Sequence, residues 1–324
     1  MRLPNFEYFE PTDIQAAVAF LQNQPGAKIL AGGTDLLINL KHRIELPGAV
    51  VNIKGLDDLN YIRQDDGNLR IGGLTTLKQI YQTPLIQNKL PCLAEATAAV
   101  GSYHHQTMGT LAGNICQQNR CKYFNQSQWW RSSRPTCFKA GGEICHIVNK
   151  KEICYSSYCG DVAPALIALN ARIAATGPGG SRQILVEELF SGDGKQPLTL
   201  SAAEIVTEII IPPETMEGIS SYAKFANRGS IDFPIVGAAC WASLESKQYR
   251  VAFTAVDRKP VRCHRVEAVL NGQDLSEDNL NRACDLAAKE AKPLKTSVYS
   301  PAYKRRLMGL LLKNAVGRAE RRDA

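Results

Sequence analysis

Apolar and polar positions in the first two thirds of the chain predict a mixture of short helices and strands. Apolar residues recur at helical spacing from Ile14 to Leu21, and Thr12 with Gln15 forms the capping box expected at the start of such a helix. Asp65-Asp66-Gly67-Asn68 predicts a β-hairpin, because Asp and Gly favour the turns that join paired strands. Other expected elements up to residue 211 are strands at 28–31, 49–53 and 204–211, helices after residue 76, at 91–100 and at 162–169, and a hairpin of 172–176 with 183–186.

A change in the pattern marks a domain boundary near residues 214–218. Pro212-Pro213 stops the strand before it, because proline cannot donate a ladder hydrogen bond. Beyond the boundary, three strand candidates precede three helix candidates, an order typical of an α+β domain. The strands are expected at 219–226, 235–242 and 249–257, and the helices at 264–271, 275–291 and 302–320.

Length and composition limit the kind of protein. A chain of 324 residues with 44% hydrophobic and 21% charged residues is expected to form two or three globular domains. No apolar run is long enough to predict a membrane span, and the first residues lack the apolar core of a secretory signal, so we expect a cytoplasmic protein. The net charge of +7 is modest, and it suits a helix surface or an acidic protein partner better than nucleic acid.

Six of the ten cysteines fall within residues 116–159, a block that also contains Trp129 and Trp130. In a cytoplasmic protein, clustered cysteines bind metal more often than they form disulfides. Four thiolates that converge hold either a structural zinc ion or an iron–sulfur cluster. The block therefore predicts a metal centre of one of these two kinds.

Two segments rich in small residues have the character of phosphate-binding loops. Ala31-Gly32-Gly33-Thr34-Asp35 follows a predicted strand, and Gly109-Thr110-Leu111-Ala112-Gly113-Asn114 is the second segment. Glycine lets backbone N–H groups approach a phosphate closely, and threonine adds a donor. Each segment alone is more often a plain turn, and neither matches the dinucleotide fingerprint or the Walker motif.

Together these segments resemble the FAD-binding subunits of the molybdenum hydroxylase family, which includes xanthine and carbon monoxide dehydrogenases. Three further motifs carry the resemblance: Asp161-Val162-Ala163-Pro164-Ala165-Leu166, Tyr222-x-Lys224-Phe225 and Arg228-x-x-x-Asp232-Phe233-Pro234. The resemblance spans residues 1–320 and implies an α+β fold. A two-part FAD-binding domain of the vanillyl-alcohol-oxidase/PCMH type should occupy 1–215, with parts at about 1–55 and 56–215. A C-terminal α+β domain like that of the CO dehydrogenase flavoprotein should occupy 216–324.

The resemblance implies a bound FAD and assigns residues to it. Residues 29–37 should wrap the pyrophosphate, Thr110 and Asn114 should contact phosphate or ribitol, Asp161 should reach the ribose or flavin, and Lys224 should lie near the isoalloxazine. The expected cofactor-binding residues are Ile29, Leu30, Ala31, Gly32, Gly33, Thr34, Asp35, Leu36, Val100, Thr110, Asn114, Gln117, Asp161 and Lys224.

The chain departs from the family pattern at two places. Ala112 stands where the family usually has glycine, and its methyl group is tolerable if φ stays negative. His104-His105-Gln106 stands where relatives often carry Gln-Ile-Arg, which puts any contact of that arginine in doubt. We expect the histidine pair to be structural rather than metal-binding.

Ile115 and Asp161 are separated by 45 residues, far more than in most of the family. The inserted block, about 116–158, resembles that of the 4-hydroxybenzoyl-CoA reductase branch, which carries a [4Fe–4S] cluster. By this resemblance the ligands are Cys121, Cys137, Cys145 and Cys154, and their spacing lacks the close pairs usual in zinc sites. Cys116 and Cys159 are expected beside FAD. Four other cysteines are expected to be core thiols: Cys92, Cys240, Cys263 and Cys284.

The resemblance implies an electron-transfer subunit without catalytic residues of its own for the substrate. Turnover would lie on a molybdenum-cofactor large subunit, reached through a small subunit with two [2Fe–2S] clusters, in a dimer of heterotrimers. The main expectation is reductive dehydroxylation of 4-hydroxybenzoyl-CoA to benzoyl-CoA with reduced ferredoxin as donor. Two alternatives stay open: the flavin subunit of an aldehyde or N-heterocycle hydroxylase, and a zinc-stabilised, flavin-free scaffold subunit.

Overall fold

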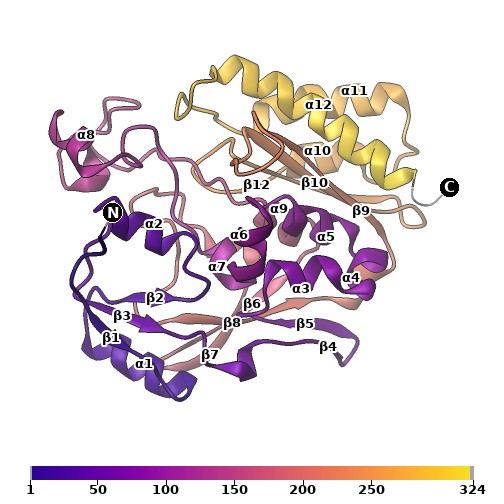
Figure 1. Ribbon diagram of the computed structural model, residues 1–324. Helices are drawn as coiled ribbons and strands as arrows, with labels where there is room; N and C mark the ends of the chain where they lie inside the picture. The colour runs from indigo at the N-terminus through magenta and orange to yellow at the C-terminus, as the bar shows by residue number, and fades with distance from the viewer. Residues whose placement is uncertain (1, 322–324) are drawn as a thin grey trace.

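The computed structural model describes residues 2–321, which form four layers stacked sheet, helices, sheet, helices (Figure 1). A small N-terminal part lies at one end of this stack. It contains a parallel sheet of order β1-β3-β2, with helix α1 packed on it through Ala17, Val18 and Leu21. Its elements are β1 (Glu7–Phe9), α1 (Ile14–Asn23), β2 (Lys28–Leu30), α2 (Leu36–Lys41) and β3 (Ala49–Asn52).

The predicted Thr12 capping box is wrong, because the residue next to the helix takes the capping position. Asp13 is the N-cap of α1, and its carboxylate accepts from the Ala16 N–H at 2.8 Å. The Thr12 hydroxyl instead donates to the Asp13 carboxylate at 3.2 Å. An Asp directly before an apolar run is as good a cap as Thr.

The first large sheet is antiparallel, with order β4-β5-β8-β6-β7. A layer of short helices covers one of its faces, and both layers contribute to a single apolar core. The strands are β4 (Ile62–Asp65), β5 (Asn68–Gly72), β6 (Arg172–Gly177), β7 (Gly180–Leu185) and β8 (Ile205–Ile211). The helices are α3 (Leu77–Gln82), α4 (Pro84–Lys89), α5 (Pro91–Ala98), α6 (Tyr103–Met108), α7 (Leu111–Ile115) and α9 (Val162–Ala168).

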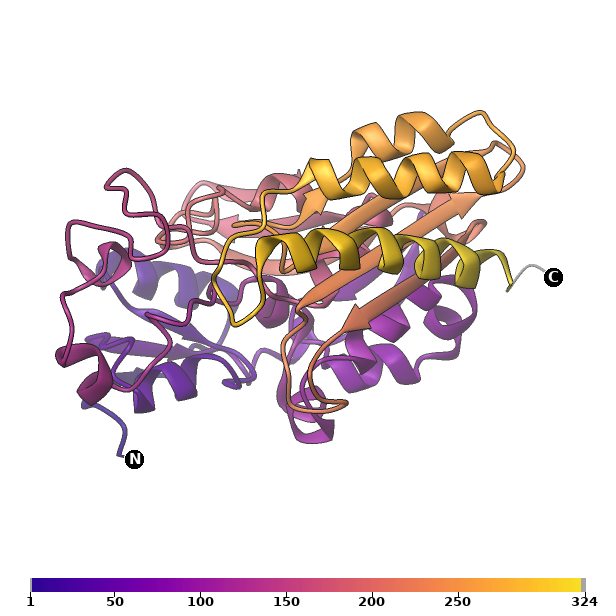
Figure 2. The same ribbon diagram turned by 90° about the horizontal axis from the view of Figure 1, so that it is seen from above.

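The C-terminal part is an antiparallel sheet of order β12-β11-β10-β9, covered on its outer face by three helices (Figure 2). The α+β prediction is confirmed, since the strands precede the helices as the sequence pattern indicates. The predicted boundary at 215/216 falls in the turn Pro213–Met216, between the two sheets. The elements are β9 (Ile219–Phe225), β10 (Val236–Ser243), β11 (Gln248–Thr254), β12 (Val261–Arg262), α10 (His264–Leu270), α11 (Glu277–Glu290) and α12 (Pro301–Glu320). The end of the predicted domain, residues 322–324, lies outside the described residues.

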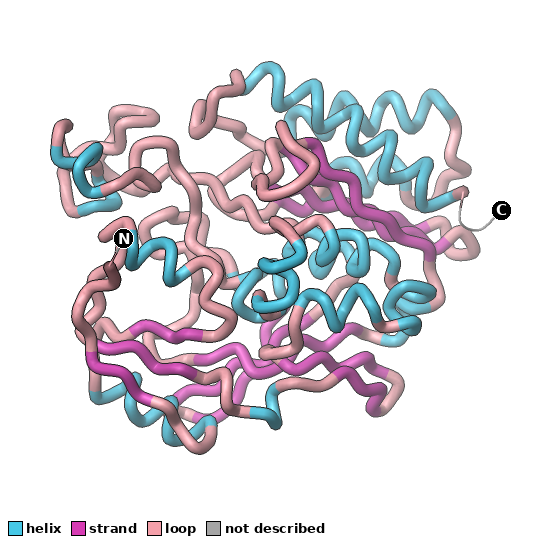
Figure 3. Tube along the Cα trace, viewed as in Figure 1, coloured by secondary structure: helices cyan, strands magenta, loops and turns pink. Residues whose placement is uncertain are grey.

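The inserted block leaves the helical layer after α7 and returns to it at α9. It is mostly loop, with helix α8 (Gln128–Ser132) and a 3₁₀ turn, Phe138–Ala140 (Figure 3). The block contacts both the N-terminal part and the C-terminal part of the protein. Arg131 donates to the Arg43 carbonyl at 2.6 Å, and the Lys122 N–H donates to the Thr296 carbonyl at 3.2 Å. Among the described residues, no helix is long and apolar enough to span a membrane.

Candidate cofactor site

A cavity of about 580 Å³ opens where the N-terminal sheet, the helical layer and the loop after β9 meet. All but two of the residues expected to bind FAD line this cavity. The lining members are Ile29, Ala31, Gly32, Gly33, Thr34, Asp35, Leu36, Val100, Thr110, Asn114, Gln117 and Asp161. Leu30 is instead a buried core residue of β2. Lys224 does not line the cavity either, but contacts the lining residue Asp161 from the protein side. Residues that are far apart in the sequence are thus brought to one site.

The first small-residue segment runs close against the second, and glycine makes this approach possible. A Cβ at Gly32 would lie 2.0 Å from the Met108 carbonyl oxygen. Gly33 has a φ of +76°, a conformation that favours glycine. The segment therefore presents bare backbone to the cavity.

The second segment is the start of α7 rather than a loop. The Thr110 hydroxyl caps this helix and accepts from the Gly113 N–H at 3.2 Å. Ala112 is inside the helix, so its φ is negative and its methyl group is tolerated, as expected. Among the described residues, the buried Oδ1 of Asn114 has no hydrogen-bond partner. A buried polar atom in a cavity wall without a partner fits a site that receives a polar ligand.

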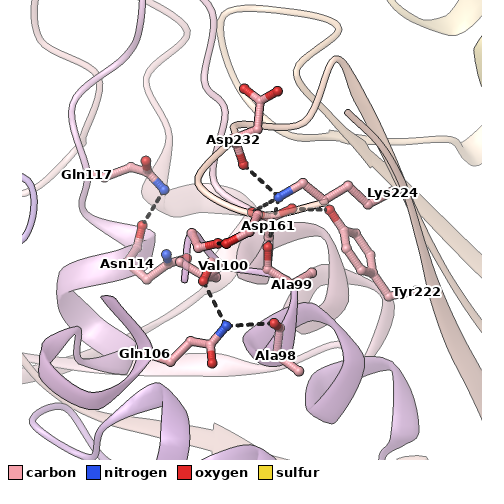
Figure 4. Close-up of polar contacts among 12 residues, drawn as sticks. Ala98, Ala99, Val100, Gln106, Asn114, Gln117, Asp161, Tyr222, Lys224 and Asp232 are labelled. Atoms are coloured by element: carbon pink, nitrogen blue, oxygen red, sulfur yellow. Dashed lines mark hydrogen bonds and ion pairs between the residues drawn. The ribbon is translucent and has the colours of Figure 1, made fainter. Parts of the chain in front are cut away.

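A buried network of Asp161, Tyr222 and Lys224 joins the cavity wall to the C-terminal sheet (Figure 4). The Tyr222 hydroxyl donates to Asp161 Oδ1 at 2.7 Å, and Lys224 Nζ donates to Asp161 Oδ2 at 3.1 Å. Lys224 also donates to the carbonyls of Ala99 and Asp232, at 2.8 and 2.9 Å, so its ammonium group is fully used inside the protein. Burial raises the pKa of Asp161 to about 6, against the opposing effect of Lys224.

The cavity wall contains residues that the sequence reasoning missed. Arg120 forms an ion pair with Asp35, and its guanidinium carbon lies 4.8 Å from the centre of the Phe233 ring. Phe233 and Asp232 belong to the loop after β9, and residues 195–198, 200–202 and 204–206 line another side. The Asp232-Phe233 motif was a signal of the family but had no assigned role. Arg120 carried no signal other than its place one residue before Cys121.

The four cysteines expected to be ligands lie around one small internal cavity. Cys121, Cys137, Cys145 and Cys154 line it together with Tyr123, Phe124, Phe138, Lys139, His146, Ile147 and Ser156. Burial raises the pKa of the Cys121 thiol to about 11 and that of Cys154 above its usual value. Among the described residues, no three His, Cys, Asp or Glu side chains are placed to hold a single metal ion. The four thiols thus line one common cavity.

The remaining cysteines lie away from this cavity. Cys116 and Cys159 line the large cavity instead, where burial raises their thiol pKa values to about 12 and about 11. His146, beside Cys145, contacts the Pro135 carbonyl through Nε2 at 2.9 Å. Cys92, Cys240 and Cys263 are buried in the apolar cores, and Cys284 is partly buried against α12.

Two family descriptions match the chain in succession. Residues 4–214 match the FAD binding domain in molybdopterin dehydrogenase, and residues 220–319 match the CO dehydrogenase flavoprotein C-terminal domain. Among curated relatives, the nicotinate dehydrogenase FAD-subunit of Eubacterium barkeri is 28% identical, covering 86% of this chain and 83% of its own. The carbon monoxide dehydrogenase medium chain of Hydrogenophaga pseudoflava is 26% identical, covering 99% of each chain.

The solved structures agree with this fold. A carbon monoxide dehydrogenase structure from Hydrogenophaga pseudoflava superposes with a TM-score of 0.83 over 99% of each chain, at 24% identity. Quinoline 2-oxidoreductase from Pseudomonas putida 86 superposes with a TM-score of 0.78 over 98% of each chain, at 21% identity. The chain belongs to the molybdenum hydroxylase family, as an FAD-binding subunit of the medium-chain type found in carbon monoxide and xanthine dehydrogenases.

Proposed function

We propose that this chain is the electron-transfer subunit of a molybdenum-cofactor enzyme, with FAD in the large cavity. The observation that carries the proposal is the convergence of both small-residue segments on one cavity within an FAD-binding domain. Bound FAD would supply the ability to accept and release electrons singly or in pairs. The polar atoms that support it include the unpartnered Oδ1 of Asn114.

Each part of the cavity wall has a distinct task in this proposal. Gly32 and Gly33 let the pyrophosphate approach the backbone, and Thr110 holds the second segment in place by capping α7. Asp161 presents a buried carboxyl group to the cavity, fixed by Tyr222 and Lys224. Because its ammonium group is fully used, Lys224 acts on the flavin through Asp161 rather than by direct contact.

We further propose that Cys121, Cys137, Cys145 and Cys154 hold one [4Fe–4S] cluster. Their arrangement around a common cavity supports it, because each iron of such a cluster takes one thiolate. Structural zinc usually takes closely spaced cysteine pairs, which this spacing lacks. Neither family description mentions a cluster, so the inserted block alone carries this assignment.

The partners that we propose are a molybdenum-cofactor large subunit and a small subunit with two [2Fe–2S] clusters, assembled as a dimer of heterotrimers. The relatives favour oxidation of an aldehyde or N-heterocycle, since they include FAD subunits of a nicotinate dehydrogenase and an aldehyde oxidoreductase. The four cysteines of the inserted block favour a second reaction, the reduction of 4-hydroxybenzoyl-CoA with electrons from reduced ferredoxin. A low-potential cluster suits that strongly reducing direction.

The test begins with the chain purified without oxygen. Flavin absorption, about four irons and about four sulfides per chain are expected. Zinc at the thiols with no flavin would overturn the proposal in favour of the scaffold alternative. The assembled complex would then be assayed with both substrate classes. Turnover of 4-hydroxybenzoyl-CoA with reduced ferredoxin supports the reductase, and oxidation of an aldehyde or N-heterocycle supports the hydroxylase.

A further inference from the structure

The inserted block is joined to the rest of the protein by two short strands of chain, here called the neck: residues 116–121 and 154–161. Arg120 and Ser157 exchange two backbone hydrogen bonds across it, at 2.7 and 3.0 Å. The Asn119 side chain adds a bond to the Ser156 carbonyl at 2.9 Å. The neck is thus a small paired element at the base of the block.

The two ends of the neck face different cavities. Arg120 and Cys159 line the large FAD cavity, whereas Cys121 and Cys154 line the thiol cavity. Arg120 and Cys121 are consecutive residues, so a single peptide unit separates the two cavity walls. A movement of Cys121 in the thiol cavity would therefore move Arg120 in the FAD cavity directly, through the peptide bond that joins them.

Arg120 is placed to meet an anionic ligand. Its guanidinium group pairs with Asp35 and lies over the Phe233 ring, yet among the described residues its buried Nε has no partner. Arginine presents several donors in a planar fork that suits phosphate oxygens. Without Arg120, the Asp35 carboxylate would stand as an uncompensated negative charge in a cavity that receives a pyrophosphate.

The neck is also held by the C-terminal part, since the Asn119 side chain donates to the Arg258 carbonyl at 2.7 Å and the Tyr158 N–H donates to the Asp257 carbonyl at 3.2 Å. The block beyond the neck adds little regular structure. It contains only α8 and one 3₁₀ turn, and its buried apolar side chains are few. Cys121 and Cys154 lie on opposite strands of the neck, so a cluster bound to both would tie the strands together. A metal centre of this kind contributes binding free energy to local folding.

We propose that Arg120 couples the two cofactor sites. A cluster bound at the thiols fixes the neck and holds Arg120 in the FAD cavity, where the guanidinium group binds the pyrophosphate and neutralises Asp35. Filling either site therefore raises the affinity of the other, since coupling between two binding sites is reciprocal. The proposal rests on the proposed function, because it requires both FAD and a cluster.

The experiment measures the dissociation constant of FAD by flavin fluorescence, on the full chain before and after anaerobic cluster reconstitution. We expect the cluster to tighten FAD binding about tenfold, within the usual range of coupling between sites. Arg120→Gln should weaken FAD binding and abolish the effect of the cluster. Arg120→Lys should keep part of both, because it retains the charge without the fork. If Arg120→Gln fails to fold, the Arg120→Lys variant still tests whether Arg120 couples the two sites.

Lys122→Gln is the matched control, since Lys122 adjoins Cys121 on the other side but does not line the FAD cavity. It should keep both FAD affinity and coupling. In the reciprocal measurement, FAD should slow the loss of iron to a chelator in the wild type but not in Arg120→Gln. The coupling proposal would be overturned if FAD bound equally well with and without the cluster. It would also be overturned if the cluster tightened FAD binding in both Arg120 variants as much as in the wild type. Neither result would contradict the proposed function. Failure to bind FAD or a cluster would overturn the proposed function as well.

Discussion

At the scale of single residues, a substitution of Asn114 should change the affinity for FAD without changing the stability of the protein. Its Oδ1 makes no hydrogen bond within the described residues, so removing it breaks no internal contact of that atom. Asn114→Ala should weaken FAD binding about tenfold, the value of one lost hydrogen bond, and leave the unfolding temperature unchanged. Fluorescence titration and thermal unfolding measure the two effects. Asn60→Ala, an exposed residue away from the cavity, should change neither; an unaltered FAD affinity in Asn114→Ala would contradict the assignment.

Asp161 predicts a pH dependence of stability. Burial raises its pKa from 3.8 to about 6, so between these values the folded protein holds a proton that the unfolded chain has released. The free energy of unfolding should therefore fall as pH rises through this window, by about 3 kcal/mol at most. Asp161→Asn lacks the ionisable group and should lack this slope, whereas the exposed Asp58→Asn should keep it. Denaturant unfolding from pH 4 to pH 7 measures the slopes, and parallel curves for wild type and Asp161→Asn would refute the argument.

The residues of the site divide into those that sequence motifs indicate and those that only folding brings in. Gly32, Gly33 and Thr110 stand in short segments whose composition already suggests backbone approach to a phosphate, and Asp161 stands in a motif of the family resemblance. Arg120 stands in no such segment. Its role depends on an ion pair to Asp35, 85 positions away in the chain. A contact of that range leaves no local pattern.

At the scale of elements, the sequence predicted the long helices and paired strands but missed the shortest pieces. Helix α11 has enough residues to show a helical period, and β10 is a long enough apolar run to predict a buried strand. Helices α4, α6 and α7 have only five or six residues, less than two turns, so no periodicity can develop. The second small-residue segment was therefore taken for a loop, although Thr110 is a helix cap in a favourable position.

The inserted block should depend on the proposed cluster for order. It contains little regular structure and few buried apolar side chains, and local opening is easiest in such regions. Loss of the proposed cluster should speed tryptic cleavage after the exposed Lys150 and Lys151 by about tenfold. Gel and mass analysis of timed digests measure the rate and the sites.

The cysteines of the chain supply the controls for this digestion. Cys137→Ser should be cleaved as fast as cluster-free protein, because it removes one ligand. Cys284→Ser should behave as wild type, since Cys284 lies in α11 against the Gly309 carbonyl, outside the thiol cavity. Equal rates for loaded and unloaded protein would mean that the block is ordered by packing alone.

At the scale of the whole molecule, residues of both domains line the large cavity proposed for FAD. The loop after β9 reaches back to the helical layer, where the Ile231 N–H donates to the Gly101 carbonyl at 2.7 Å. Arg318 of α12 reaches the same layer and pairs with Glu95 at 2.8 Å. The resemblance placed one residue of the C-terminal domain, Lys224, near the flavin, but it did not assign the loop around Asp232. The contact of that loop with Gly101 spans too many residues to leave a local pattern.

The inserted block also carries most of the net charge, which bears on how an electron donor would bind. Residues 116–159 contain seven Lys and Arg against two Glu, a net +5 of the chain's +7. Trp129 in α8 is 80% exposed, and α8 lies at one side of the layered body of the protein (Figure 1). An acidic one-electron carrier such as the proposed ferredoxin would be attracted to this surface, beside the thiol cavity.

Charge reversal on the block tests that attraction. Lys150→Glu with Lys151→Glu should slow reduction by ferredoxin about tenfold at low ionic strength, and the difference should shrink as salt is added, because salt screens exposed charges. Stopped-flow reduction at several salt concentrations measures both effects. Arg63→Glu with Lys89→Glu makes the same charge change on exposed residues of β4 and α4, which lie at the opposite end of the molecule from α8 (Figure 1). If both pairs slow the reaction equally, the donor responds to total charge, and the block is not its binding surface.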